Sequence, residues 1–296
     1  MKIFLTAIIL FAGITRLNAQ NTVGLLPAGL DEISGITLSS HKNVFAYVHN
    51  DSGDKSRFFA IDSNAQLITT ISFKGSENNG NVRDCEDIAV GKGAKGEQHY
   101  VDVGDIGNNF GLRPFVCVYK IAETDIQTDK TAITVTAVPV FLRYPDGPRD
   151  AETLMIDNID RLLYIVSKRE DSVHVYVSRL DWNKNDTITL TKKAVLFFAG
   201  SRPQKWIVSG DISRDGSKVI LKSLSKVYYW ERAAGEPIWK TLSRPPLELP
   251  YQKEPQGEAI CFDEKGTGYY TTSEGKNQPV YYYRIPVSNH EEARER

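Results

Sequence analysis

The stretch Glu86-Asp87-Ile88-Ala89-Val90 opens a short apolar strand with a carboxylate, and four similar openings occur elsewhere in the chain. They are Glu32-Ile33-Ser34-Gly35-Ile36, Glu152-Thr153-Leu154-Met155-Ile156, Asp211-Ile212-Ser213 and Glu258-Ala259-Ile260-Cys261-Phe262. A turn follows each opening, and then a strand rich in aromatic and aliphatic residues. The pattern therefore predicts an all-β chain built from a repeated unit.

The spacing of the openings indicates the size of that unit. The first carboxylates are 54, 66, 59 and 47 residues apart, which fits one four-stranded blade of a β-propeller with long loops. Such units cannot bury their own sheet faces, and radial stacking leaves only short edges exposed. We expect one β-propeller domain over residues 20–296, with five blades. Six blades is the alternative, if the 66-residue segment from Glu86 holds an extra sheet, and a β-sandwich fits this length less well.

The last repeat suggests how the ring closes. Only about three strands remain after Glu258, so the missing fourth strand is expected from Asn21–Leu26. An N-terminal strand paired with the last blade would close the propeller.

The first 19 residues have the features of a secretory signal peptide. Lys2 precedes an apolar run from Ile3 to Ile14, and Leu17-Asn18-Ala19 provides a small-residue cleavage site. A membrane span needs roughly 20 apolar residues, and Arg16 interrupts this run. We expect a secreted protein, periplasmic or extracellular, with no membrane span after cleavage.

Charge and cysteine content exclude some classes of protein. The chain has 36 Lys and Arg against 37 Asp and Glu, so it lacks the basic excess of a nucleic-acid-binding surface. Its three cysteines are too few for a disulfide scaffold or a zinc motif of the C-x-x-C type. A Cys85–Cys261 bridge is chemically permitted in an oxidising compartment.

The openings also predict a site. The first strand of a propeller blade is innermost, so the five openings would meet at one mouth of the central channel. The carboxylates expected there as metal ligands are those of Glu32, Glu86, Asp87, Glu152, Asp211 and Glu258. Converging carboxylates repel one another unless a cation neutralises them, and calcium prefers several hard oxygen ligands. Two alternatives are carboxylates that only fasten the blades together and a site for an organic cation.

Other polar residues follow the predicted second strands and would surround the same mouth. If the protein is an enzyme, His49 or Asp51 would handle the proton and Lys168 and Arg169 would hold an anionic substrate group. The G-x-S-x-G and H-E-x-x-H motifs are absent, so the serine-hydrolase and zinc-protease classes lack their signatures.

Several stretches together resemble those of secreted bacterial β-propellers, a group that includes the SdiA-regulated and esterase-like phytase proteins. They are Asp84-Cys85-Glu86-Asp87-Ile88-Ala89, residues 100–109, Asp150-Ala151-Glu152-Thr153-Leu154 and Gln256-Gly257-Glu258-Ala259-Ile260. Where such sequences often read D-W-E-D, this chain has Cys85. Glu86-Asp87-Ile88 is also similar to the calcium-binding step of paraoxonase-type lactonases. The resemblance implies a propeller and a calcium ligand at Glu86, and fold likeness alone does not transfer an activity.

These observations favour a secreted, calcium-associated propeller that binds a small or extracellular ligand at its acidic mouth. The first alternative is a metal-dependent hydrolase of phosphoesters, esters or lactones. The second is a metal-free scaffold for another protein.

Overall fold

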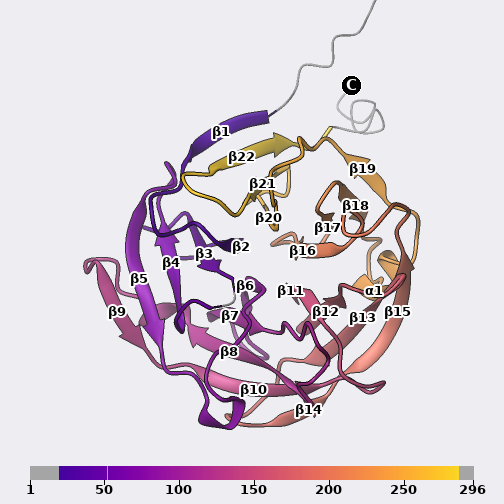
Figure 1. The fold of residues 1–296 in the computed structure, drawn as a ribbon, viewed down its shortest axis with the longest axis horizontal. Coiled ribbons are helices and arrows are strands. Elements are labelled where there is room, and N and C mark those ends of the chain that lie inside the picture. Colours follow the sequence, from indigo (N-terminus) through magenta and orange to yellow (C-terminus); the bar gives the residue numbers. More distant parts are fainter. Residues whose placement is uncertain (1–19, 52, 287–296) are drawn as a thin grey trace, which may run out of the picture.

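Figure 1 shows five sheets arranged around a central axis, each with its first strand nearest the centre. The chain is a five-bladed β-propeller, so the predicted fold is confirmed and the six-bladed alternative is wrong. This computed structural model describes residues 20–51 and 53–286, and the predicted signal peptide lies outside them. In that described part, no helix is both long and apolar enough to span a membrane.

Each blade is an antiparallel sheet whose strands follow one another outward from the channel. Blade 1 holds β2 (Ile33–Leu38), β3 (Ala46–Asn50), β4 (Arg57–Ile61) and β5 (Leu67–Phe73). Blade 2 holds β6 (Asp87–Lys92), β7 (His99–Asp105), β8 (Val116–Ala122) and β10 (Val138–Arg143). Blade 3 holds β11 (Ala151–Asp157), β12 (Leu162–Ser167), β13 (Ser172–Arg179) and β15 (Thr191–Phe197). Blade 4 holds β16 (Ile207–Ile212), β17 (Lys218–Ser223), β18 (Val227–Glu231) and β19 (Leu247–Leu249). Blade 5 holds β20 (Ala259–Phe262), β21 (Gly268–Thr272), β22 (Pro279–Arg284) and β1 (Gln20–Leu25).

The hydrophobic core is divided among the contacts between neighbouring blades. Side chains alternate across a strand, so each sheet supplies apolar residues to both of its neighbours. In β3, Tyr47 packs into the cluster shared with blade 2, whereas Ala46 and Val48 pack into the cluster shared with blade 5. Such a core exists only when the ring is complete.

The ring closes through β1, as the sequence predicted. β1 pairs antiparallel with β22, so the N-terminal strand completes the last blade. Gly24 lies at an irregularity in this pairing, and a Cβ there would fall 2.0 Å from the backbone oxygen of Asn64 in blade 1. The closing strand therefore contacts the first blade as well as the last.

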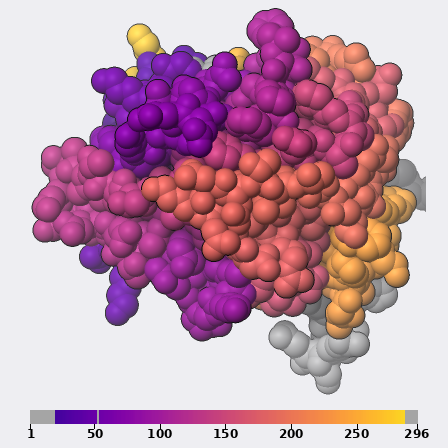
Figure 2. All heavy atoms as spheres, turned by 90° about the horizontal axis from the view of Figure 1, so that it is seen from below, coloured from indigo at the N-terminus to yellow at the C-terminus, as the bar shows by residue number. Residues whose placement is uncertain are grey.

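Two further strands join neighbouring blades at the rim. β9 (Ala132–Val135) lies between β8 and β10 in the chain but pairs in parallel with β5 of blade 1. β14 (Thr187–Thr189) lies between β13 and β15 and pairs in parallel with β10 of blade 2. Figure 2 shows this rim, where magenta and coral segments from blades 2 and 3 lie side by side. The long segment after Glu86 thus contains a strand for blade 1 and not an additional blade.

Three short helices complete the described secondary structure. They are the 3-10 turns η1 (Glu77–Asn79) and η2 (Glu123–Asp125) and the single-turn helix α1 (Ile238–Thr241). α1 follows β18 in the chain and contacts β15 of blade 3. It therefore links blades 3 and 4 at the rim.

The inner strands are fastened to one another across the channel. Asp87 of β6 accepts a hydrogen bond from the Leu154 N–H of blade 3 at 2.9 Å and one from the Ser209 hydroxyl of blade 4 at 3.3 Å. Asp211 of β16 accepts one from the Phe262 N–H of blade 5 at 2.8 Å. Since Asp87 links blades 2 and 4, which are not neighbours, the channel is narrow at its middle.

The cysteines do not form the bridge that the sequence permitted. Cys85, Cys117 and Cys261 are all buried and free. Cys85 and Cys117 lie in the core between blades 1 and 2, whereas Cys261 lies in the core between blades 5 and 1. A Cys85–Cys261 disulfide is therefore excluded by the packing of two separate clusters.

Candidate functional site: the acidic mouth

The strand register brings three sets of residues to the end of the channel where the inner strands begin. The first regular pairs of the five blades are Gly35 with His49, Asp87 with Gly104, Thr153 with Val166, Ser209 with Lys222 and Ala259 with Thr272. The first residue named in each pair belongs to the inner strand. The residue directly before it in the chain belongs to the first set, which is Ser34, Glu86, Glu152, Val208 and Glu258. Two residues earlier in the chain lies the second set: Glu32, Asp84, Asp150, Trp206 and Gln256. The third set follows the second strands and includes Asp51, Lys168 and Glu274.

Backbone hydrogen bonds hold the second and third sets together. The N–H groups of Asp51, Lys168 and Glu274 donate to the carbonyls of Glu32, Asp150 and Gln256 at 2.7, 3.0 and 3.0 Å. The same bond thus recurs in blades 1, 3 and 5. It fixes where each of these three residues enters the mouth.

Five carboxylates converge on the side of this opening formed by blades 1, 2 and 5, and we call them the acidic mouth. They are Asp51, Asp84, Glu86, Glu258 and Glu274. Carboxylate oxygens of Asp51, Asp84 and Glu86 lie within 4.8 Å of one another, and so do those of Asp51, Glu258 and Glu274. Two oxygens bound to one calcium ion at 2.3–2.6 Å lie at most about 5 Å apart. Both triads therefore satisfy the spacing that one such ion requires, and Asp51 belongs to both.

Glu86 has a strongly perturbed environment. Its residue surface is only 3% exposed, and the carboxyl group of Asp84 lies within hydrogen-bonding distance of its own. Burial, followed by the charges of Asp51 and Asp84, raises the pKa of Glu86 well above its ordinary value, against the opposite effect of Lys168. Burial and the charge of Asp150 likewise raise the pKa of Asp84. At Glu86 and Asp84, burial and the neighbouring carboxylates thus outweigh the attraction of Lys168 and Arg113.

The second triad repeats this situation in blade 5. Burial and the charge of Glu258 raise the pKa of Glu274 to about 9, with smaller effects from Asp51 and Glu32. The Oε1 atom of Glu274 is buried and has no hydrogen-bond partner within the described residues. The nearby cation, Lys222, donates a hydrogen bond to the Gly257 carbonyl, and its Nζ lies 3.9 Å from a different carboxylate, Glu254. Lys222 also attracts the charge of Glu258, but burial and the charge of Glu258 still dominate at Glu274.

Gly107 allows the carboxylates of blade 2 to approach the backbone closely. A Cβ at this position would fall 2.3 Å from Oδ2 of Asp84 and 2.4 Å from Oε1 of Glu86. The Gly107 N–H also donates to the Asp84 carbonyl at 3.1 Å. The β7–β8 loop therefore forms one wall of the acidic mouth.

The part of the opening formed by blades 3 and 4 is different, because its charges are paired. Lys168 forms a buried ion pair with Glu152, and the partly exposed Arg169 pairs with the buried Asp150 at 2.5 Å. The Lys168 Nζ lies 5.5 Å and the Arg169 guanidinium 4.9 Å from the centroid of the Trp206 ring. An anionic ligand could bind Lys168 or Arg169 only if the existing ion pairs with Glu152 or Asp150 were broken.

The structure places the six predicted metal ligands in different settings. Glu86 and Glu258 lie in the acidic mouth, and Glu32 is exposed beside it. Glu152 lies at the same level but is paired with Lys168. Asp87 lies deeper in the channel, where it fastens blades 2, 3 and 4.

The expectation that Asp211 joins this mouth is wrong. Asp211 pairs with Ile220 near the β16–β17 turn, whereas β16 begins four residues earlier at Ile207. At about 3.3 Å per residue, this separation takes Asp211 to the other end of the strand. In blade 4, Val208 occupies the position that Glu86 and Glu258 have in their blades. The Asp211-Ile212-Ser213 stretch is therefore not equivalent to the strand openings of those blades.

Of the four residues predicted for catalysis, three reach the opening. Asp51 belongs to the acidic mouth, and Lys168 and Arg169 lie across from it. His49 instead is only 1% exposed and lies over Gly35, with its Nδ1 2.9 Å from the Asn50 carbonyl. Burial lowers the pKa of His49 to about 4, so the ring is neutral near pH 7. Its position within the wall does not suit a proton carrier for a ligand at the mouth.

Three members of the acidic mouth, Asp51, Asp84 and Glu274, were not predicted as metal ligands, and Asp51 was predicted for proton transfer instead. The sequence signal that could have identified Glu274 is its position after a second strand, which matches that of Asp51. Asp84 occupies the position of Glu32 two residues before the repeat carboxylate. Both signals depend on the strand register, which the repeat alone does not give.

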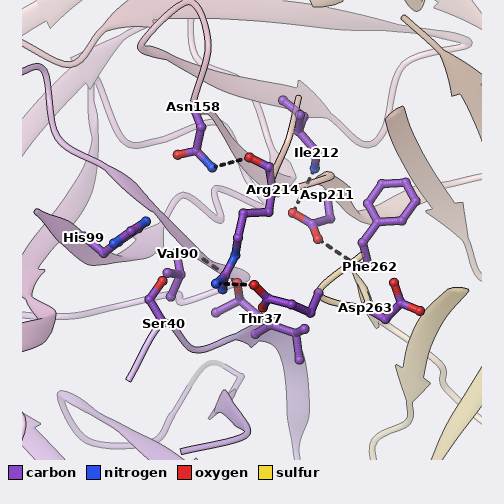
Figure 3. Close-up of a pocket in the computed structure, with 12 residues that line it drawn as sticks. Thr37, Ser40, Val90, His99, Asn158, Asp211, Ile212, Arg214, Phe262 and Asp263 are labelled. Atoms are coloured by element: carbon purple, nitrogen blue, oxygen red, sulfur yellow. Dashed lines mark hydrogen bonds and ion pairs between the residues drawn. The ribbon is translucent and has the colours of Figure 1, made fainter. Parts of the chain in front are cut away.

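The far end of the channel has a polar recess, which we call the far opening (Figure 3). Several of its groups pair with one another: Arg214 pairs with Glu264 at 2.8 Å, and Asp211 accepts the N–H groups of Ile212 and Phe262. The Val90 N–H donates to the Thr37 hydroxyl at 3.1 Å. These contacts fasten the blades to one another.

The fold and site together define a five-bladed β-propeller with a carboxylate-lined channel mouth. A comparable solved structure is that of a putative 6-phosphogluconolactonase from Bacteroides uniformis ATCC 8492. The two chains are 12% identical, with a TM-score of 0.43, and the match covers 91% of this chain and 69% of the other. No protein-family model and no curated protein matches the sequence. The similarity to the SdiA-regulated and phytase-like groups therefore rests on the short motifs alone.

Proposed function

We propose that this protein binds calcium at its acidic mouth and, through the ion, a small extracellular ligand. The observation that carries the proposal is the environment of Glu86 and Glu258, which are only 3% and 5% exposed. Each lies against other carboxylates, in triads whose oxygens are within 4.8 Å of one another. Buried charges are costly unless they are paired or bind a metal. A divalent cation would compensate this charge.

Calcium fits this donor set better than a transition metal does. The acidic mouth offers carboxylate oxygens, and neither His nor Cys belongs to the two triads. Calcium accepts six to eight oxygen ligands in a flexible geometry, whereas imidazole and thiolate ligands favour zinc, copper or iron. Three carboxylates leave several coordination positions for water or a ligand. An affinity in the submillimolar range of extracellular calcium modules would suit the secretion that residues 1–19 predict.

The geometry favours ligand binding over hydrolysis. A hydrolase would need a group that accepts a proton beside the metal. His49 is buried within the wall, and Asp51, the other residue predicted for that role, would itself be a metal ligand in both triads. Lys168 and Arg169, the residues expected to hold an anionic substrate, are paired with Glu152 and Asp150. The ion would instead orient a ligand oxygen, while the mouth excludes part of the surrounding water.

Calcium titration by isothermal calorimetry tests this proposal directly. The wild-type protein should bind calcium, and Glu86→Gln and Glu258→Gln should each weaken binding about tenfold or more, because each removes a charged ligand. Glu264→Gln at the far opening is the matched control and should bind as the wild type does. Circular dichroism should show that all variants keep the fold. Unchanged affinity in both mouth variants would refute the proposed site. A wild-type protein that does not bind calcium would favour the alternative of a metal-free scaffold for another protein.

A further inference from the structure

Beside the acidic mouth, the β7–β8 loop carries two apolar side chains that are almost fully exposed. Phe110 is 87% and Leu112 is 81% exposed. Single exposed apolar residues are common on protein surfaces and need no explanation. Two of them at the tip of one loop, next to a candidate binding site, are a more specific feature.

A buried polar network holds this loop in a fixed shape. Asn108 and Arg113 form two hydrogen bonds with each other across the tip, at 3.1 and 3.0 Å. Arg113 is itself buried, pairs with Asp105 at 2.8 Å and donates to the Gly107 carbonyl at 2.6 Å. The tip is therefore braced at its base, and these bonds would have to break for the loop to collapse onto the surface.

The base of the loop is also part of the mouth wall. The Asn109 side chain donates to Oδ2 of Asp84 at 3.5 Å and accepts a hydrogen bond from Arg169. The Asn108 N–H donates to Asp150 at 2.8 Å. Phe110 thus directly follows a residue that contacts both the acidic mouth and the cation across from it.

We infer that the ligand of the mouth is an amphiphile, with an oxyanion that completes the coordination of the calcium ion and an alkyl or acyl chain that packs on Phe110 and Leu112. This inference rests on the proposed function, because the oxyanion needs the bound cation. The ion fixes the charge of the head group, because calcium with coordination positions still open prefers a hard anionic oxygen as a further ligand. The apolar tip then contributes in proportion to the hydrocarbon that it covers.

A pair of ligands with the same head group separates the two contributions. With calcium present, calorimetry should show hexyl phosphate binding at least about tenfold tighter than methyl phosphate, because each fully buried methylene contributes about fourfold. The double variant Phe110→Ser/Leu112→Ser should lose most of this difference while keeping its calcium affinity. Leu247→Ser, which alters an exposed leucine on the outer strand of blade 4, is the matched control and should change neither.

Several results would overturn the inference, and they differ from failure of the calcium site. Equal affinity for the two phosphates, binding of neither, or an unchanged difference in the double variant would each contradict it while calcium binding persists. Binding only to phosphatidylglycerol vesicles, with no affinity for soluble hexyl phosphate, would also contradict it and indicate a surface contact. If the wild-type protein did not bind calcium at all, the proposed function itself would be refuted instead.

Discussion

At the scale of single residues, the defining feature of the described chain is a group of buried carboxylates whose neighbours and burial raise their pKa values. The clearest case is Glu274, whose Oε1 atom is buried without a partner in the described chain and whose pKa is raised to about 9. An ordinary glutamate in an unfolded chain titrates near 4.3. Folding without metal therefore favours the protonated form of this carboxyl group.

Replacing Glu274 should make stability depend less on pH. Between about pH 4.5 and 9 the folded protein keeps a proton on Glu274 that the unfolded chain has lost, so the wild-type free energy of unfolding falls as pH rises. Glu274→Gln has no such titration. In chelator it should be the more stable protein, by about 2–4 °C at pH 8 if about 1 kcal/mol is relieved, and by less at pH 5.

Thermal unfolding at several pH values, followed by circular dichroism, measures this difference. Glu264→Gln, in an exposed ion pair at the far opening, should show no pH-dependent gain. A variant at Glu274 that is less stable than the wild type in chelator at pH 8 would mean that this carboxylate has a cation partner within the protein.

At the scale of elements, the strand register decides which parts of the site are predictable. The repeat identified Glu86, Glu152 and Glu258 correctly as equivalent, because each directly precedes a regular pair of its blade. It failed in blade 1, where Ser34 takes this position and Glu32 lies two residues earlier. It also failed in blade 4, where an apolar Val208 takes this position and Asp211 lies three residues farther along the strand. A spacing of carboxylates cannot detect such a slip, since both positions lie in one short strand.

The repeated sequence pattern also could not predict the strands that connect neighbouring blades. β9 and β14 belong by sequence to blades 2 and 3 but pair with the outer strands of blades 1 and 2. Each is a short strand with no partner nearby in the chain. The blade that such a strand joins depends on how the blades pack. The sequence of the long segment after Glu86 therefore could not exclude a sixth blade.

The closing strand β1 gives a prediction at this scale. Gly24→Ala would place a Cβ 2.0 Å from a backbone oxygen of Asn64, so β1 would have to shift away from blade 1. Overpacking of this kind costs about 1–3 kcal/mol. Urea unfolding should show this loss for Gly24→Ala, whereas the exposed Thr22→Ala in the same strand should change stability by less than about 0.5 kcal/mol. Equal stability of the two variants would mean that β1 does not hold the ring closed.

At the scale of the whole molecule, the carboxylates at the two ends of the channel have different surroundings. At the far opening, carboxylates accept backbone N–H groups or pair with arginine, and Asp87 closes the middle of the channel. At the acidic mouth, carboxylates from blades 1, 2 and 5 face one another. The sequence predicted an acidic end, but Asp51 enters both triads only because the ring brings blades 2 and 5 to either side of blade 1.

The measurement that tests the central claim most directly is thermal unfolding of the wild-type protein and of Asp51→Asn, in chelator and then with calcium added. A ligand that binds only the folded state stabilises it by RT ln(1 + [L]/Kd), about 2.7 kcal/mol at a concentration of 100 Kd. The wild type should therefore unfold several degrees higher with calcium, by about 2–4 °C for each kcal/mol. Asp51→Asn should lose most of this gain, because both triads share Asp51. No shift in the wild type, or an equal shift in the variant, would contradict a calcium site at the acidic mouth.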